Sequence, residues 1–459
     1  MSRPITAITS IGDLMAALAG KAPQVLELQT SVACPYSITL PPGYSLVGKD
    51  KDRSVLVFCN GDGLALTADN QVSNLTVITS PAARAIYTHT GLADMGTISL
   101  SDLAVTGQVS IITRTGTERL QLLVKGLHIA ACDSRHYSEQ PQKYGVNVYQ
   151  GALTVYNFSG DKQSRIQATL TGITIGAKNA PVLGSGVFVS GFGDQGGWVE
   201  VDQLTTGAVY STGMLPYGTA DIITAAVFVV YGATAKRVEH HGEIVTYGVN
   251  DMVLDTWGTV EQWTAHAPII SYGPSGIGFV NFGTVQDFVA KDKVVTYGLG
   301  ARGFNQYDGK VDTIRFQSIE TFGDGSIGIQ ISKPVGSITI EQGITTHGSI
   351  GNTLVKGVIM PLPAQALSVK SGGSVEKLLV GGDLLTEGAK VTTYAIEGGT
   401  VAAIDIQGQV LAQGEGSDAI VVASQGATPL THVRAHAKAG AALRLLDGEI
   451  TDRTGFVEQ

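Results

Sequence analysis

Residues 244–248 read Ile-Val-Thr-Tyr-Gly, and variants of this segment return every 25 residues. The later copies are Ile-Ile-Ser-Tyr-Gly at 269–273, Val-Val-Thr-Tyr-Gly at 294–298, Ile-Glu-Thr-Phe-Gly at 319–323 and Ile-Thr-Thr-His-Gly at 344–348. Each copy keeps an aliphatic residue, a hydroxyl residue, a ring and a glycine in the same order. A fixed period of this length indicates a stack of similar structural units.

A second apolar column follows the same period, and its members are Leu254, Phe279, Phe304, Ile329 and Leu354. In stacked parallel coils, each residue lies about 4.8 Å above its equivalent in the preceding coil, so apolar columns fill the interior. The hydroxyl column that starts at Thr246 is expected to form a buried ladder. No six-residue period typical of left-handed β-helices is present, and 25 residues are too few for a propeller blade. The pattern predicts an all-β fold, a right-handed single-stranded parallel β-helix.

The chain outside the regular repeats predicts the ends and the interruptions of this solenoid. Residues 1–22 should form an N-terminal segment with a capping helix, because Ser10 is a helix N-cap residue, Asp13 stands at the capping-box position and Gly20 is a stop signal. Residues 23–445 are expected to form about 14 coils, and 446–459 a C-terminal tail. Longer segments near 131–168, 205–222 and 350–370 are expected to project as loop insertions.

Composition argues against several classes of partner. The formal net charge is −9, and no Lys/Arg run favours a nucleic acid. No run of about 18 apolar residues predicts a membrane span. The three cysteines are widely spaced, and no secretory leader is recognisable at residue 1, which together favour reduced thiols and the cytoplasm. A shortened chain or an unconventional export route would give the same pattern, so an unknown location is the alternative. No metal-binding spacing, phosphate loop or dinucleotide fingerprint indicates a cofactor.

Two aromatic columns are candidate ligand surfaces. Trp257, Phe282 and Tyr307 form one, and Trp263 and Phe288 begin another. Repeated rings most simply stabilise a solenoid by stacking. The alternative is a sugar-binding platform, because two of the three tryptophans fall in one coil, where Trp257 and Trp263 would meet the C–H faces of a carbohydrate.

A carboxylate column gives a candidate catalytic pair. Glu261 aligns with Gln286 and, after a one-residue insertion, with Asp312. If the column points outward, two coils separate Glu261 and Asp312 by about 9.6 Å at the backbone. Side-chain freedom brings this within the roughly 6.5–9.5 Å of an inverting glycosidase pair, with one residue as general acid and the other as general base. The alternative is a solvated polar face.

The remaining candidates for substrate binding are Asp255, Arg302 and Lys236. The two cations would hold an acidic sugar or stabilise an enolate-like intermediate of β-elimination, although such side chains are more often simply solvated. Asp251 and Asp255 are alternatives as acidic groups, four residues apart on one strand face.

The start of the solenoid carries a family resemblance. Leu-Pro-Pro-Gly at 40–43 and Tyr-Ser-Leu-Val-Gly at 44–48, with the coil length and the capping helix, resemble the pectin-lyase-like superfamily. The resemblance implies a parallel β-helix and frequent action on polysaccharides. The Asn-Thr-Asp, Asp-Asp, Gly-His-Gly and Arg-Ile-Lys segments of polygalacturonases and the Trp-Ile-Asp-His segment of pectate lyases are absent, so no catalytic residue carries over.

Two hypotheses for function follow. The first is a carbohydrate-active protein that cleaves a polysaccharide or oligosaccharide as a glycoside hydrolase or lyase, in a groove along the coils between residues 236 and 312. The second is a non-catalytic structural, adhesive or assembly protein, in which the chain forms a homo-oligomer, for example a trimer.

Overall fold

The computed structural model describes residues 3–89, 91–355 and 358–459. The chain divides into two compact units. Unit 1 contains residues Met1–Gln142, Asn147–Thr212 and Val227–Val238, and unit 2 contains Lys143–Val146, Gly213–Ala226 and Glu239–Gln459. Four strands contain residues of both units, namely β13 (Gln142–Lys143), β14 (Val146–Val148), β20 (Ile222–Val229) and β21 (Ala233–His240).

Unit 1 consists of parallel strands and one helix. The helix, α1 (Ile11–Leu18), begins at Ser10, whose hydroxyl accepts a hydrogen bond from the backbone N–H of Asp13, as the sequence predicts. Leu14 and Ala17 form its buried face. The longest ladder of unit 1 contains, in pairing order, β1 (Ile5–Ile8), β2 (Val25–Leu28), β5 (Ser45–Gly48), β8 (Gln71–Ile78), β10 (Asp94–Thr106), β12 (Arg119–Ala131), β16 (Arg165–Ile175) and β19 (Trp198–Thr212).

Other strands complete unit 1. A second parallel ladder contains β4 (Ile38–Leu40), β7 (Leu64–Leu66), β9 (Arg84–Thr88), β11 (Gln108–Arg114), β15 (Gly151–Phe158) and β18 (Ser185–Ser190). The short strands are β3 (Val32–Cys34), β6 (Val55–Phe58) and β17 (Val182–Leu183).

Unit 2 repeats three strands in each coil. The first ladder contains β22 (Ile244–Thr246), β25 (Ile269–Ser271), β28 (Val294–Thr296), the ends of β30 (Lys310–Thr321) and β32 (Pro334–Thr346), β37 (Asp383–Thr386), β40 (Val410–Ala412), β43 (Arg434–Ala437) and β46 (Val457–Glu458). The second contains β24 (Thr259–Ala265), β27 (Thr284–Ala290), the starts of β30 and β32, β36 (Ser374–Val380), β39 (Thr400–Ile406), β42 (Ala427–Thr428) and β45 (Glu449–Ile450).

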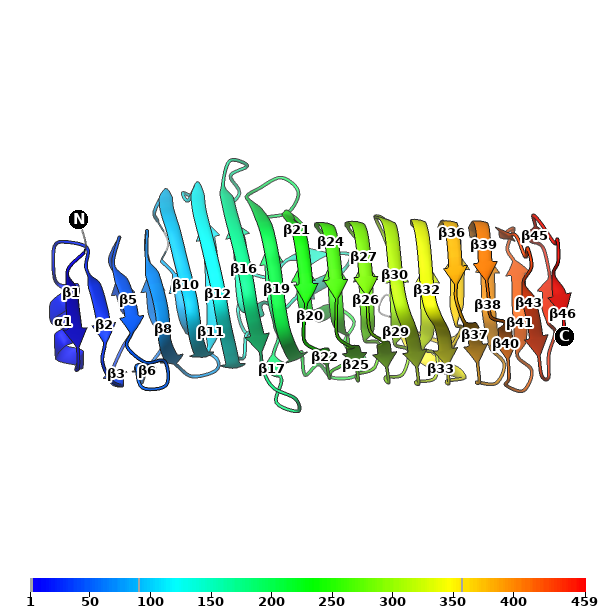
Figure 1. Ribbon diagram of the computed structural model, residues 1–459, viewed down its shortest axis with the longest axis horizontal. Helices are drawn as coiled ribbons and strands as arrows, with labels where there is room; N and C mark the ends of the chain where they lie inside the picture. The colour runs from blue at the N-terminus through cyan, green and yellow to red at the C-terminus, as the bar shows by residue number, and fades with distance from the viewer. Residues whose placement is uncertain (1–2, 90, 356–357) are drawn as a thin grey trace. The chain divides into compact units, whose positions relative to one another are not determined.

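The third ladder of unit 2 carries the site described below. It contains β23 (Asp251–Thr256), β26 (Ile277–Asn281), β29 (Arg302–Gln306), β31 (Ile327–Ile331), β35 (Leu367–Lys370), β38 (Thr392–Glu397), β41 (Asp418–Ala423) and β44 (Leu443–Leu445). All three ladders are parallel, and Figure 1 shows β24, β27, β30, β32, β36 and β39 side by side in chain order. The prediction of an all-β fold of stacked parallel strands is confirmed.

The register in unit 2 follows the sequence period. Ile244 pairs with Ile269, and the column continues through Val294, Ile319 and Ile344. The hydroxyl column is fully buried, as predicted, at Thr246, Ser271, Thr296, Thr321 and Thr346. Phe279 stacks on Phe304 with ring centroids 5.3 Å apart, and both are buried in the core.

The repeated glycine is required by a close approach of the backbone. A Cβ added to Gly273 would lie 1.7 Å from the carbonyl oxygen of Gly248, and one added to Gly298 would lie 1.9 Å from that of Gly273. The same contact recurs at Gly323 and Gly348. Any side chain in this column would therefore push neighbouring coils apart.

The prediction that Leu354 is the fifth member of the second apolar column is wrong. Ile329 pairs with Leu367, not with Leu354, since the chain leaves the stack after β32. Leu354 lies in an antiparallel hairpin formed by β33 (Ile350–Val355) and β34 (Val358–Pro363). Leu354 keeps the 25-residue spacing in the sequence but not the stacking in the structure, because the hairpin begins at the position where another coil would start.

Candidate functional site

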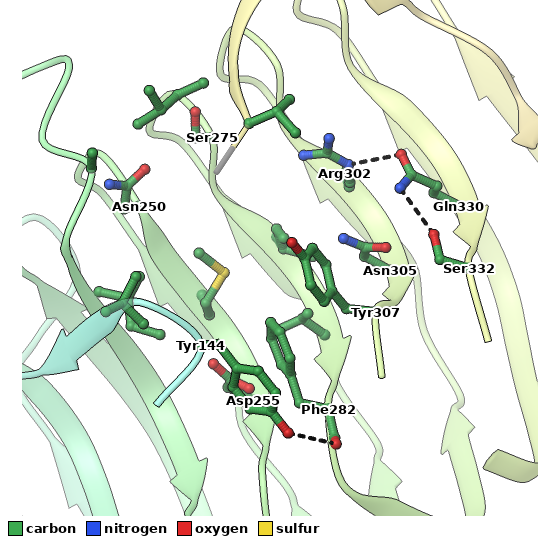
Figure 2. A pocket seen from close by; sticks show the side chains of 18 of the residues that line it. Tyr144, Asn250, Asp255, Ser275, Phe282, Arg302, Asn305, Tyr307, Gln330 and Ser332 are labelled. Atoms are coloured by element: carbon green, nitrogen blue, oxygen red, sulfur yellow. Dashed lines mark hydrogen bonds between the residues drawn. The ribbon is translucent and has the colours of Figure 1, made fainter. Parts of the chain in front are cut away.

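Unit 2 contains a cavity of about 460 Å³ over the third ladder. Strands β23, β26, β29 and β31 contribute to its lining (Figure 2). The polar and aromatic lining residues are Tyr144, Asn250, Asp255, Ser275, Phe282, Arg302, Asn305, Tyr307, Gln330, Ser332 and Lys333. This volume and this mixture of apolar surface with a few polar groups are typical of small-ligand sites.

The strand register sets the order of polar groups across the cavity. Asp255 pairs with Val280, Val280 with Asn305, and Asn305 with Gln330. Successive partners in a parallel ladder are about 4.8 Å apart, so Asp255 and Asn305 are separated by about 9.6 Å at the backbone. Figure 2 shows Asn305 and Tyr307 between Asp255 and Arg302.

Inserted segments supply the walls. Tyr144 and Val146 come from the 143–146 segment, Ala220 and Ile223 from the 213–226 segment, and Leu354 from the β33–β34 hairpin. The hairpin lies close to the turns of the coils, because a Cβ added at Gly300 would fall 2.5 Å from the side chain of Thr353. Tyr144, Ala220 and Leu354 fall within the ranges where the sequence predicts loop insertions, and the bounds of those insertions stay a prediction.

Asp251 fastens the 213–226 segment to β23. Its carboxylate accepts a 2.6 Å hydrogen bond from the Thr224 hydroxyl, a 2.9 Å bond from the backbone N–H of Gly213 and a 2.6 Å bond from that of Gly248. The side chain is fully buried. Asp251 therefore has a structural role that accounts for its charge.

Asp255 differs from Asp251 although both are buried on the same strand. Asp255 is 0% exposed, and neither carboxyl oxygen makes a hydrogen bond of ordinary geometry with a described residue. Burial raises the pKa of Asp255 well above its usual range, and the backbone N–H of Thr256 offsets this only in part. An unpartnered buried carboxyl group at a cavity is a candidate functional group.

Arg302 is the second buried polar group at the cavity. It is 7% exposed, and it makes two long hydrogen bonds of 3.4 Å, from Nε to Oε1 of Gln330 and from Nη1 to the carbonyl oxygen of Gly300. No carboxylate of the described residues forms an ion pair with it. Burial lowers the pKa of Arg302 to about 10, partly opposed by Tyr307, so the guanidinium is still charged at neutral pH.

Aromatic rings follow the cavity floor. The rings of Phe282 and Tyr307 lie 4.6 Å apart, and Tyr144 packs 4.6 Å from Phe282 and 5.4 Å from Trp257. The phenol of Tyr144 also donates a 3.3 Å hydrogen bond to the carbonyl oxygen of Phe282. Trp257 is 4% exposed, so its ring is covered by its neighbours instead of forming an open platform.

The structure does not bring the predicted pair Glu261 and Asp312 to this cavity. Glu261 lies on β24 and Asp312 on β30, in the second ladder of unit 2. Asp312 is exposed and accepts a 3.1 Å hydrogen bond from Lys310. Neither residue lines the cavity, and their catalytic roles stay a prediction.

Two further predicted binding residues are placed elsewhere. Trp263 is completely buried in the core, where its indole Nε1 donates a 2.8 Å hydrogen bond to Nε2 of His240. Lys236 is an exposed residue of unit 1 that forms a 2.8 Å ion pair with Asp202. Of the predicted binding residues, Asp255 and Arg302 are the two that line the cavity.

Sequence reasoning missed Asn305, Gln330 and Tyr144. Asn305 and Gln330 follow Asp255 at 50 and 75 residues, so extending the Asp255 column along the period finds them. Tyr144 lies in an insertion that has no period, and its backbone takes a positive φ of 57°. No sequence signal connects it with this cavity.

The described residues contain neither a candidate metal site nor a candidate membrane-spanning helix. No group of three or more His, Cys, Asp or Glu side chains is arranged to hold a metal ion in this part of the chain. No described helix has the length and apolar character to cross a membrane. Comparisons with protein-family models, with curated proteins and with solved structures found no match.

Proposed function

We propose that the chain is a carbohydrate-active parallel β-helix protein that binds an acidic sugar in the unit 2 cavity. The proposal includes the right-handed coiling, the pectin-lyase-like character and the about 14 coils that the sequence predicts. One observation carries it: Arg302 is buried at the cavity without a carboxylate partner among the described residues.

A buried guanidinium without a counter-charge is costly for the folded protein. A ligand carboxylate would supply that counter-charge and could accept two parallel hydrogen bonds from the planar donor group. Asp255 cannot act as the counter-charge in the structure, because it forms no ion pair with Arg302. This supports an anionic ligand, and a carboxylate matches the guanidinium geometry.

The rest of the lining supports a sugar as the remainder of the ligand. Phe282 and Tyr307 present rings for the C–H faces of a pyranose. Asn250, Asn305 and Gln330 offer amides for hydroxyl groups. Alternating apolar faces and hydroxyl groups are the surface features of a carbohydrate.

The presence of a single carboxyl group among the described lining residues of the cavity favours elimination over hydrolysis as the reaction. Asp255 is the one carboxyl side chain among its described lining residues, whereas glycosidases ordinarily use two. In β-elimination, a base takes the proton from the carbon next to the uronate carboxylate, a C=C bond forms, and the glycosidic C–O bond breaks so that the leaving sugar departs with its oxygen. A cation holding the carboxylate stabilises the negative charge that develops as that proton leaves. Arg302 supplies such a cation. The alternative of a binding protein without catalysis is favoured by the burial of Asp255, because the one carboxyl group among the described lining residues has no contact with solvent.

The test is binding and cleavage of a panel of neutral and uronate oligosaccharides by the wild type, Arg302→Gln and Arg315→Gln. Arg315 is an exposed residue of β30 outside the cavity and serves as the matched control. We expect uronates to bind the wild type and the control with equal affinity. Arg302→Gln should bind them at least about 10-fold more weakly, as loss of a hydrogen bond to a charged group predicts.

Cleavage is followed through unsaturated uronate absorbance and through new reducing ends. Absorbance with reducing ends supports a lyase, and reducing ends alone indicate a hydrolase. Saturable binding without either supports the non-catalytic alternative. Equal binding of neutral and acidic oligosaccharides, or an unchanged affinity in Arg302→Gln, overturns the proposal.

A further inference from the structure

Asp255 is a buried carboxyl group at the cavity without a hydrogen-bond partner of ordinary geometry among the described residues. The residue is 0% exposed, and both of its carboxyl oxygens lack such a partner. In a folded protein such a group either binds something or costs free energy. Asp251, four residues earlier, shows the usual alternative, since its carboxylate accepts hydrogen bonds from Thr224 and from two backbone N–H groups.

The surroundings of Asp255 do not stabilise a negative charge. The titratable or charged residues at the cavity are Tyr144 from the 143–146 segment, Arg302 on β29, Tyr307 after β29, and Lys333 after β31. On β29, the residue level with Asp255 is Asn305, two rungs away. Arg302 lies three residues before Asn305 on the same strand. This offset is about 14 Å at the backbone and is beyond the reach of an ion pair. Lys333 lies on a still later coil and pairs with Asp308 at 3.7 Å.

We propose that Asp255 binds the ligand as a neutral carboxylic acid, donating its O–H to a ligand oxygen, while Arg302 holds the ligand carboxylate at the other end of the cavity. This inference rests on the proposed function and specifies its ligand. A neutral carboxyl group has one donor, and an acceptor oxygen of a sugar satisfies it without a buried charge. The two anchors then contact different parts of one ligand.

The spacing of the two anchors sets the ligand length. Asp255 and Arg302 are two rungs apart across the ladder and three residues apart along it, which is about 14 Å at the backbone. A single pyranose ring is shorter than that span. The cavity is therefore matched to an acidic disaccharide, with its rings along Phe282 and Tyr307.

The experiment measures the affinity for digalacturonate and galacturonate, as probes, between pH 5 and pH 9. The proteins are the wild type, Asp255→Asn and Asp255→Leu. Asparagine keeps a hydrogen-bond donor and does not titrate, whereas leucine removes the hydrogen-bond donor. We expect the wild type to prefer the disaccharide and to lose about 10-fold in affinity for each pH unit above the Asp255 pKa. Asp255→Asn should bind within about 3-fold of the wild type at pH 5 and show no such loss, and Asp255→Leu should bind at least about 10-fold more weakly.

A difference infrared spectrum of the wild type minus Asp255→Asn, without ligand, separates this inference from the proposed function. A carboxylic acid C=O band at pH 7 supports the neutral form. A carboxylate band, or disaccharide binding that strengthens as the pH rises and fails in Asp255→Asn, overturns the inference while the uronate site stands. Absence of uronate binding together with the acid band overturns the proposed function and the ligand assigned to Asp255.

Discussion

The indole Nε1 of Trp263 donates a 2.8 Å hydrogen bond to Nε2 of His240, and both side chains are completely buried in unit 2. Since Nε2 accepts this bond, His240 is neutral in the folded protein with its proton on Nδ1. Burial, with smaller contributions from His241 and His266, lowers the pKa of His240 to about 3. We therefore expect the free energy of unfolding of unit 2 to depend on pH through His240.

The first prediction concerns stability in acid. An unfolded histidine takes up a proton near pH 6.5, whereas His240 in the folded protein stays neutral until about pH 3. The unfolded state therefore binds more protons in this window, and stability falls as the pH decreases. We expect a contribution of about 1.4 kcal/mol per pH unit from this residue. Urea unfolding of the wild type and of His240→Gln, from pH 7 to pH 4.5, measures it.

Glutamine is the matched variant because it offers an acceptor to Trp263 and does not titrate. The variant should be less stable than the wild type at pH 7 and should lose less stability on acidification. Parallel pH profiles for the two proteins would show that His240 is not the group responsible.

The Trp263 column shows what the repeat predicts well. Trp263 and Phe288 follow the period, pair in register, and lie in the core, which agrees with the simpler interpretation of repeated rings as structural. A period predicts which residues are neighbours, because stacked coils impose it. The period does not predict which columns face the interior. The sequence alone is therefore also compatible with Trp263 as part of a sugar platform.

The second prediction concerns the glycine column. A Cβ on Gly298 would lie 1.9 Å from the carbonyl oxygen and 2.3 Å from the carbonyl carbon of Gly273, and these backbone atoms cannot move independently of the coil. Gly298→Ala should therefore destabilise unit 2 by about 1–3 kcal/mol, as for an overpacked core. Denaturant unfolding followed by tryptophan fluorescence measures this, since two of the three tryptophans lie in unit 2.

Gly12→Ala in α1 is the control. The nearest atom to a Cβ at Gly12 is the Ser10 side-chain oxygen at 3.6 Å, and alanine favours a helix. This variant should be as stable as the wild type or slightly more stable. Equal stability of Gly298→Ala and the wild type would mean that neighbouring coils are not packed as closely as described.

The third prediction concerns His347, the last residue of the column of rings that includes the exposed Phe322. His347 stacks on Phe322 at 4.5 Å, and its two nitrogens contact Glu387 at 2.6 Å and Glu320 at 3.0 Å. Burial lowers the pKa of His347, but the hydrogen bonds with Glu320 and Glu387 outweigh it and raise the pKa overall. Because the folded state holds this proton more tightly, the stabilisation is complete below pH 6.5 and is lost as the pH rises through the folded pKa.

His347→Phe tests this relationship, since phenylalanine continues the ring stack without the charge. The wild type should be more stable than the variant at pH 5.5, and the difference should shrink by pH 8.5. His347→Ala, which also removes the stack, should be less stable than His347→Phe at both values. A difference between wild type and His347→Phe that is constant with pH would contradict the assigned ion pairs. Thermal unfolding at the two pH values is sufficient.

The candidate site was predictable only in part. The sequence indicates Arg302 as a cation for an acidic sugar and Asp255 as an alternative acidic group, and both line the cavity. The cavity is also lined by Tyr144, Ile223 and Leu354, which come from segments outside the regular repeats. A repeat places residues within its own coils, but an insertion has no register with them. The burial that makes Asp255 unusual was therefore not accessible from the period.

The fourth prediction concerns Tyr144 as a cover for the Asp255 end of the cavity. Its ring packs 5.4 Å from Trp257, two residues beyond Asp255, and 4.6 Å from Phe282, and it lines the same cavity (Figure 2). Tyr144→Ala should admit water to Asp255, and hydration of the charged form should lower the pKa of the carboxyl group. Infrared titration of the Asp255 band measures this. Tyr144→Phe keeps the ring and should leave the pKa unchanged, as should Tyr217→Ala, which removes an exposed ring bound to the backbone of Asn352. If Tyr144→Ala titrates like the wild type, the burial of Asp255 comes from its own strand and its neighbours, not from the insertion.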